Sequence, residues 1–238
     1  RGAREARGRG RPHRVRYYAN RDEYNAALRH RQPKIDQTIG IYFDQQHESH
    51  FFAGEDQHPA TLFHETTHQL FQESRRTARN VGALDNFWVI EGVATYMESL
   101  AVHTILPAAE DSRHATGTAI RPNDSIRYYT LGGPEAGRLP AARERVVQDQ
   151  YYVPLADVVR LGKEDLQNRP DIAKLYSQFA GLTAFLIHAD DGKYRESLVE
   201  YLVAVYSGQA DVDTLAKLTG ASYPELDREY MAWMDTLQ

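Results

Sequence analysis

Two histidines four positions apart, in the segment FHETTHQL at residues 63–70, constrain this chain more than any other feature. Residues at positions i and i+4 share one face of an α-helix, with Cβ atoms about 5–6 Å apart. On a helix, His64 and His68 can direct imidazole nitrogens at one ion, about 2.0–2.1 Å from each nitrogen, as Zn²⁺ prefers. The segment therefore predicts a helix that carries two metal ligands.

The residues needed to complete such a site are carboxylates. Glu65 follows the first histidine and can reach a water on the metal rather than the metal itself, which is the position of a general base. A catalytic zinc takes three protein ligands, and the chain has no Cys, so the third must be a carboxylate or another histidine. Glu91 is favoured because it lies on a second predicted helix, where Gly92 permits close helix approach. Glu98 shares a face with Glu91 and could accept a proton from the far nitrogen of a ligand histidine.

The spacing of these residues resembles one class of enzyme. HETTH at 64–68, followed by WVIEGVATYME at 88–98, is similar to the gluzincin zinc metallopeptidases, in particular the aminopeptidase-N-type and related peptidase-MA families. The resemblance implies that one Zn²⁺ per chain is bound by His64, His68 and Glu91. It also implies that Glu65 is the catalytic base and that Glu98 supports a ligand.

Two further sets of residues follow from the same resemblance. Gluzincins use a tyrosine or histidine to hydrogen-bond the oxyanion of the reaction, and YSQFAGLTAFLIH at 176–188 makes Tyr176 the candidate. They also keep an edge strand, upstream of the active-site helix, that pairs with the substrate backbone. HFFAG at 50–54 takes that place, so the expected substrate-binding residues are Phe51, Phe52, Ala53 and Gly54. No counterpart of the aminopeptidase Gly-x-Met-x-Asn segment precedes residue 64, so endo- and exopeptidase action both stay open.

Hydrophobic periodicity and turn residues predict an α+β fold that is mostly helical. Strands are expected at 13–19, 38–44 and 50–54, the last two as a hairpin. Helices are expected at 20–30, from Pro59 through the histidines, at 84–103 with Asp85 or Asn86 as the cap, and at 171–189, 192–207, 211–219 and 223–237. Loops are expected over 104–150, which is rich in Pro, Gly, Arg and Asp. The chain would then be a single domain over 13–238, with a small sheet packed on the active-site helix up to about 103 and a helical bundle from about 151.

The N-terminal residues differ in charge from the rest. The first sixteen hold seven Arg and one Glu, so of the formal net charge of −5 they contribute +6 and the remainder −11. We interpret residues 1–12 as a flexible basic leader. A nucleic-acid arm is not favoured because no aromatic residues alternate with these arginines to stack bases. No run of eighteen or more apolar residues indicates a membrane span, and the absence of Cys leaves the cellular compartment open.

Three functions are consistent with these features. A zinc peptidase acting on a peptide or protein substrate is favoured because Glu65 is retained. A catalytically silent zinc domain that holds a peptide or protein partner is the alternative, and a nucleic-acid binder with a coincidental HETTH is the third. The segment HESH at 47–50 also contains two histidines, but a polar hairpin turn accounts for it.

Overall fold

The computed structural model describes residues 12–55, 57–74, 77–105 and 126–237. Its strands are β1 (Arg14–Tyr18), β2 (Ile41–Phe43), β3 (Glu48–Phe52), β4 (Ala101–Ile105) and β5 (Ile126–Thr130). Its α-helices are α1 (Arg21–Leu28), α2 (Pro59–Ser74), α3 (Phe87–Met97), α4 (Leu139–Val147), α5 (Leu155–Val158), α6 (Lys163–Gln167), α7 (Ile172–His188), α8 (Arg195–Ser207), α9 (Thr214–Thr219) and α10 (Tyr223–Thr236). The fold is α+β and mostly helical, as predicted.

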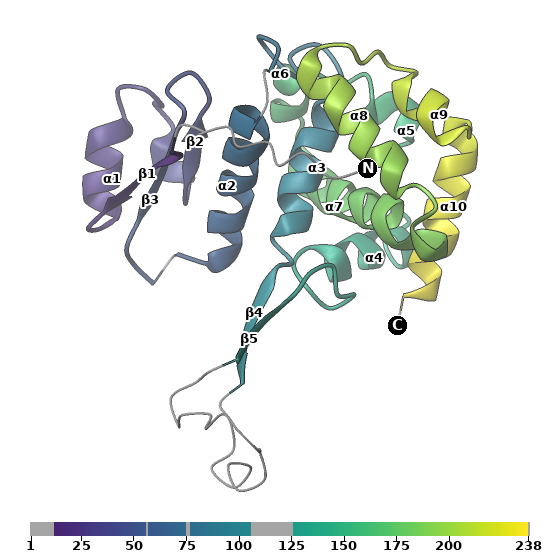
Figure 1. The fold of residues 1–238 in the computed structure, drawn as a ribbon, viewed down its shortest axis with the longest axis horizontal. Helices are drawn as coiled ribbons and strands as arrows, with labels where there is room; N and C mark the ends of the chain where they lie inside the picture. Colours follow the sequence, from purple (N-terminus) through teal and green to yellow (C-terminus); the bar gives the residue numbers. More distant parts are fainter. Residues whose placement is uncertain (1–11, 56, 75–76, 106–125, 238) are drawn as a thin grey trace, which may run out of the picture.

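A small sheet lobe forms the N-terminal part, in which the sheet lies between α1 and α2 (Figure 1). The strand order is β1-β3-β2, with β1 parallel and β2 antiparallel to β3. On one face, Tyr24 of α1 packs against Phe52. On the other face, the Ser49 hydroxyl donates to Gln69 Oε1 of α2 at 2.8 Å, which ties α2 to the sheet.

The predicted edge strand at residues 50–54 is wrong. β3 is the central strand, because β1 pairs with one side of it and β2 with the other. Phe51 and Phe52 are 0% and 1% exposed, and Ala53 and Gly54 follow the end of the strand. Consecutive buried residues are typical of a strand that is covered on both faces, so the run of aromatic residues indicated a central strand rather than a substrate-binding edge.

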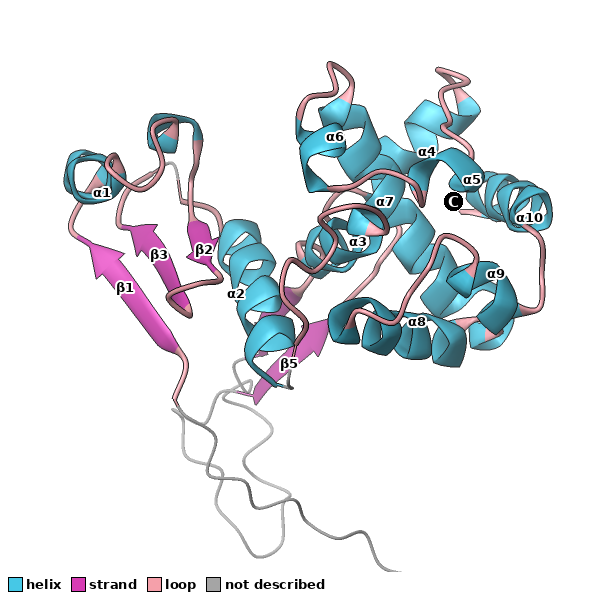
Figure 2. Cartoon of the chain, turned by 90° about the horizontal axis from the view of Figure 1, so that it is seen from above, coloured by secondary structure: helices cyan, strands magenta, loops and turns pink. Residues whose placement is uncertain are grey.

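A helical lobe is built around α3, which is buried along almost its whole length (Figure 2). Trp88 of α3 donates its indole N–H to the Tyr201 hydroxyl of α8 at 3.1 Å, and neither side chain is exposed. Gly92 faces α7, where an added Cβ would lie 2.7 Å from Thr183 Oγ1. The glycine therefore permits close approach of α7, and not of α2 as the sequence had suggested.

The segment between the two predicted helical regions is more ordered than expected. α3 ends at Met97 rather than at residue 103. Just after this end, the Ser99 hydroxyl donates to the Tyr96 carbonyl at 2.6 Å. The chain then enters β4, which pairs antiparallel with β5 in a hairpin that projects from the molecule (Figure 1). α4 follows with Pro140 in its first turn, where the missing proline N–H is not needed. The C-terminal helices therefore begin at Leu139, in α4, instead of near residue 151.

The two lobes have separate hydrophobic clusters, one around Tyr24 and Phe52 and a larger one around Trp88 and Phe179. Whether they form a single domain stays a prediction. The predicted basic leader falls outside the described residues except for Pro12. Among the described residues, no helix is both long and apolar enough to cross a lipid bilayer.

Candidate metal centre

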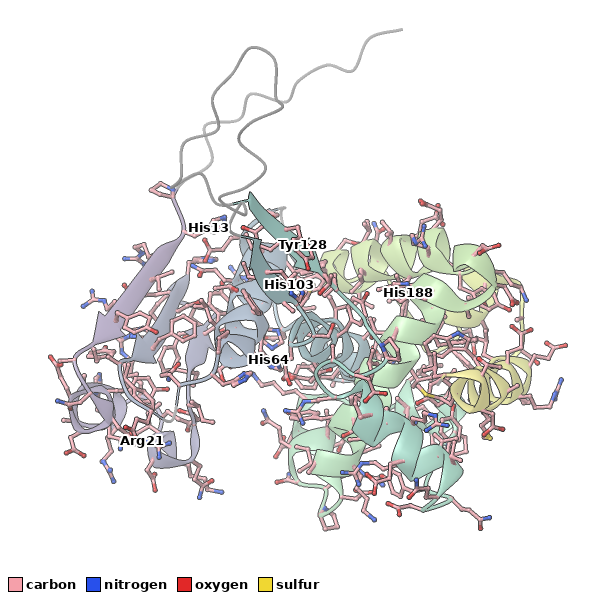
Figure 3. All side chains as sticks on the ribbon, turned by 90° about the horizontal axis from the view of Figure 1, so that it is seen from below. His13, Arg21, His64, His103, Tyr128 and His188 are labelled. Atoms are coloured by element: carbon pink, nitrogen blue, oxygen red, sulfur yellow. The ribbon has the colours of Figure 1, made fainter. Side chains whose placement is uncertain are left out.

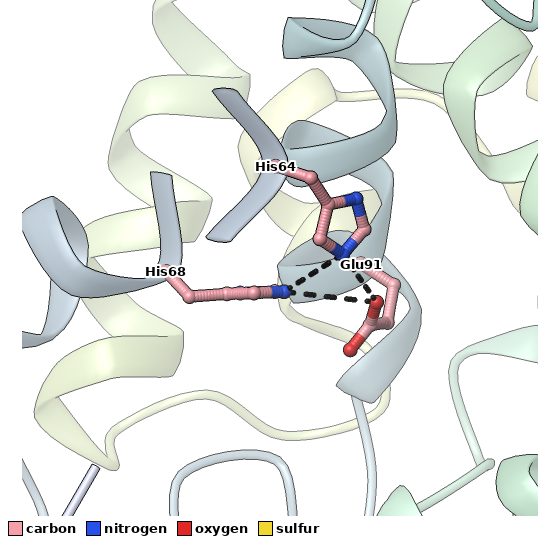
Figure 4. A group of neighbouring side chains, drawn as sticks. All are labelled: His64, His68 and Glu91. Atoms are coloured by element: carbon pink, nitrogen blue, oxygen red, sulfur yellow. Dashed lines mark hydrogen bonds and ion pairs between the residues drawn. The ribbon is translucent and has the colours of Figure 1, made fainter. Parts of the chain in front are cut away.

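Three side chains from two helices meet between the lobes. His64 and His68 project from α2 and Glu91 from α3, and their functional atoms point at one another (Figure 4). The two Nε2 atoms lie 3.1 Å apart, and Glu91 Oε2 is 3.5 Å from Nε2 of His64 and 3.8 Å from Nε2 of His68. The three predicted ligands are therefore brought together where α2 packs against α3.

The spacing of these atoms fits a small cation. Three atoms at the measured separations lie on a circle of radius about 2.0 Å, which matches the zinc–ligand distances of about 2.0–2.2 Å for imidazole and carboxylate. The side chains of His64, His68 and Glu91 are 14%, 16% and 10% exposed. The group could hold a metal ion.

The other histidines of the described residues do not form a comparable group. His50 is buried in the sheet lobe and bonds the Tyr18 hydroxyl through Nδ1 at 3.0 Å. His103 stacks on Tyr128 in the hairpin, and His188 bonds the Tyr96 hydroxyl in the helical lobe. Figure 3 shows His103 and His188 apart from His64. The HESH segment therefore contributes no metal group.

Glu98 orients the first histidine from behind. Its Oε1 lies 2.9 Å from His64 Nδ1, the nitrogen that faces away from Glu91. A hydrogen bond at this nitrogen fixes the ring and its tautomer, which is how outer carboxylates support metal-binding histidines. The contact predicted from the spacing of Glu91 and Glu98 is thus present, with Glu98 at the C-terminal end of α3.

The charges around these residues favour a cation at their centre. Burial opposes a positive His64, but hydrogen bonds to Glu91 and Glu98 outweigh it and raise the pKa of His64 to about 10. Burial lowers the pKa of His68. Burial also disfavours an ionised Glu91, yet His68 and His64 hold the pKa of Glu91 below its ordinary value. A histidine must lose its extra proton before it can bind a metal. A divalent cation that replaces the proton on His64 would supply positive charge beside the same carboxylates.

Glu65 lies on the same helix as the histidines and faces the sheet edge. Its Oε2 accepts a hydrogen bond from the backbone N–H of Tyr42 at 2.8 Å. Since Tyr42 belongs to β2, the outer edge of that strand faces the predicted base. The strand itself was predicted within residues 38–44, but its position at the sheet edge was not, because strand order depends on which distant segments pair.

Tyr176 belongs to α7 and lies within electrostatic reach of the same group. Burial raises the pKa of Tyr176, and the charges of Glu91, Glu65 and Glu98 raise it further. The phenol therefore stays protonated. Its ring centre lies 5.8 Å from the guanidinium carbon of Arg138, whose Nε donates to Glu98 Oε2.

Arg138 was not identified from the sequence. It precedes α4 and donates from Nε to Glu98 Oε2 at 2.8 Å. The contact joins residues forty positions apart, in a segment expected to be loop, so no spacing pattern indicated it.

Comparison of the chain with protein-family models, with curated proteins and with solved structures found no match. The chemical interpretation therefore depends on the geometry and charge of this group of side chains.

Proposed function

We propose that the chain is a zinc-dependent peptidase of the gluzincin type. The observation that carries the proposal is the convergence of His64, His68 and Glu91 on one point at zinc–ligand distances. Two imidazoles and one carboxylate with an open fourth position are the donor set of catalytic zinc in peptidases. Glu65 on the ligand helix adds the base that a purely structural site does not need.

Each residue has a role in peptide hydrolysis. His64, His68 and Glu91 would hold the ion, which when bound would lower the pKa of a coordinated water from about 15.7 to about 7. Glu65 takes a proton from the attacking water as its oxygen bonds to the peptide carbonyl carbon, and delivers it to the leaving amine when the C–N bond breaks. Tyr176 donates a hydrogen bond to the carbonyl oxygen while that oxygen carries negative charge.

The substrate is proposed to be a peptide or protein segment in extended conformation. β2 is an edge strand, and its Tyr42 amide points at Glu65. A peptide that added to this edge by backbone hydrogen bonds would pass beside the base. β2 therefore takes the role that the sequence had suggested for residues 50–54.

A digest of a mixed peptide library by the wild-type chain, with zinc measured by elemental analysis, tests the proposal. We expect about one zinc per wild-type chain. His64→Ala should lose this zinc, because the two remaining protein ligands are too few to hold the ion. Glu65→Gln should keep the zinc and lose cleavage. The matched control is Glu200→Gln, an exposed glutamate of α8, which should leave both unchanged.

The same experiment separates the alternative function. A wild-type chain that binds zinc and cleaves nothing would instead be a silent domain that holds a peptide or protein partner. Full cleavage by Glu65→Gln would contradict the proposed mechanism.

A further inference from the structure

One carboxylate connects a predicted metal ligand to an arginine. Glu98 Oε2 accepts a hydrogen bond from Arg138 Nε at 2.8 Å, and Glu98 Oε1 is hydrogen-bonded to His64 Nδ1 at 2.9 Å. Both oxygens of Glu98 are therefore engaged, and its side chain is only 12% exposed. Burial raises the pKa of Glu98, but the bonds to His64 and Arg138 outweigh it and hold the pKa below its ordinary value.

Arg138 is itself held in place. Its guanidinium carbon lies 5.8 Å from the centre of the Tyr176 ring, within the range of a cation–π contact. Glu98 closes α3, Arg138 opens α4 and Tyr176 belongs to α7, so three elements meet at the guanidinium. A planar guanidinium in contact with a ring and a carboxylate has few orientations available to it.

We propose that Arg138 is a positioning residue of the metal centre, which acts on His64 through Glu98. A carboxylate with a single partner can rotate about its terminal bond, whereas Glu98 is fixed on both oxygens. The far-nitrogen partner of a ligand histidine sets the direction of the ring, so Arg138 determines where His64 Nε2 points. The inference depends on the proposed zinc site, and it names a residue two hydrogen bonds away from the ligand atom.

Two effects of Arg138 on zinc binding have opposite signs and must be separated. Removal of the positive charge of Arg138 removes its repulsion of the cation and so favours zinc binding, whether or not Arg138 contacts Glu98. Loss of the fixed Glu98 weakens binding. The effect of the charge persists when Glu98 is replaced, whereas the effect of positioning does not. A double-mutant cycle therefore isolates the positioning contribution.

The experiment measures zinc dissociation constants by competition with a chromophoric chelator. It uses the wild-type chain, Arg138→Met, Glu98→Gln and the double variant. We expect Glu98→Gln to weaken binding about 10- to 100-fold, as outer-shell partners do. Arg138→Met should weaken binding about 10-fold more in the wild-type background than in the Glu98→Gln background. Circular dichroism checks the folding of each variant, and Arg138→Gln replaces Arg138→Met if the latter does not fold.

Arg169→Met is the matched control. Arg169 also donates from Nε to a carboxylate at 2.8 Å, that of Asp171, and its side chain is 34% exposed against 35% for Arg138. It should leave zinc affinity unchanged. An equal effect of Arg138→Met in both backgrounds, including no effect, would overturn the role of Arg138 and leave the metal centre intact. A wild-type chain that binds no zinc would overturn the metal centre, and this inference with it.

Discussion

The crossing of α3 and α7 at Gly92 links the packing of the helical lobe to the proposed zinc ligand. In Gly92→Ala the new Cβ would lie 2.7 Å from Thr183 Oγ1 and 3.1 Å from the Phe179 carbonyl oxygen. Ordinary van der Waals contact begins at 3.4 Å, so both neighbours must move. The Thr183 hydroxyl can rotate, since it is buried without a hydrogen-bond partner, but the Phe179 carbonyl is part of the α7 backbone.

The magnitude follows from two opposing effects. Overfilling a packed core costs about 1–3 kcal/mol, and because the Phe179 carbonyl is backbone, the cost here lies in the upper part of that range, about 2–3 kcal/mol. Alanine in place of glycine inside a helix stabilises the helix by about 1 kcal/mol. We expect a net loss of about 1–2 kcal/mol in the free energy of unfolding. For a chain of this size, that corresponds to a fall of about 2–8 °C in Tm.

Gly92→Ala should also weaken zinc binding, because Glu91 is the preceding residue and moves with α3. Thermal unfolding with and without zinc, together with chelator competition, measures both effects. Gly54→Ala is the control, since its added Cβ would lie 3.8 Å from the nearest atom, in Phe52. A Gly92→Ala chain with unchanged Tm and unchanged zinc affinity would refute the tight crossing.

Three further changes test separate parts of the structure. Tyr176→Phe should lower kcat about 100- to 1,000-fold, as loss of an oxyanion donor does, with zinc content unchanged; steady-state kinetics on a peptide identified in the library digest measures it. Tyr201→Phe leaves the buried Trp88 Nε1 without its acceptor and should cost about 1–3 kcal/mol in urea unfolding. Hydrogen bonding to Arg169 is the main cause that lowers the pKa of Asp171 to about 2, so this carboxylate stabilises the fold above its unfolded pKa of about 3.9. Near pH 6, the free energy of unfolding of the wild-type chain should exceed that of Asp171→Asn by about 1 kcal/mol or less, because the pair is partly exposed. This difference should disappear as pH falls from about 4 to about 2. Urea unfolding across that range is the measurement, and a difference that persists at the lowest pH would contradict the prediction.

Features set by neighbouring residues could be predicted from the sequence. The i, i+4 spacing of His64 and His68 predicted their helix, and the helix predicted at 20–30 corresponds to α1, which Asn20 caps by accepting the Glu23 amide at Oδ1 at 2.9 Å. Asn86 stands at the cap position of α3, but it has positive φ and no capping bond, since its oxygen accepts the Tyr201 hydroxyl instead. Local propensity does not report such long-range partners.

Features set by distant pairing could not be predicted in this way. The central position of β3 depends on β1, which pairs with it in parallel across more than thirty residues. The contact of Arg138 with Glu98 depends on how α4 packs against α7, which brings Arg138 to the end of α3. The meeting of Glu91 with the two histidines was inferred from a resemblance to known enzymes rather than from spacing alone. The helix α4 did carry a local signal, Pro140 near its start, which the composition of the surrounding segment obscured.

The proposed ligands lie on two helices that pack against each other: α2 carries the two imidazoles and also contacts the small sheet, while Glu91 belongs to α3 at the centre of the helical lobe. A bound ion would cross-link these two helices. Gentle denaturation that separates α2 from α3 would release the ion, and with it the proposed peptidase activity, while most helices remain intact. The proposed activity and far-ultraviolet ellipticity are therefore expected to disappear at different denaturant concentrations, with the activity lost first.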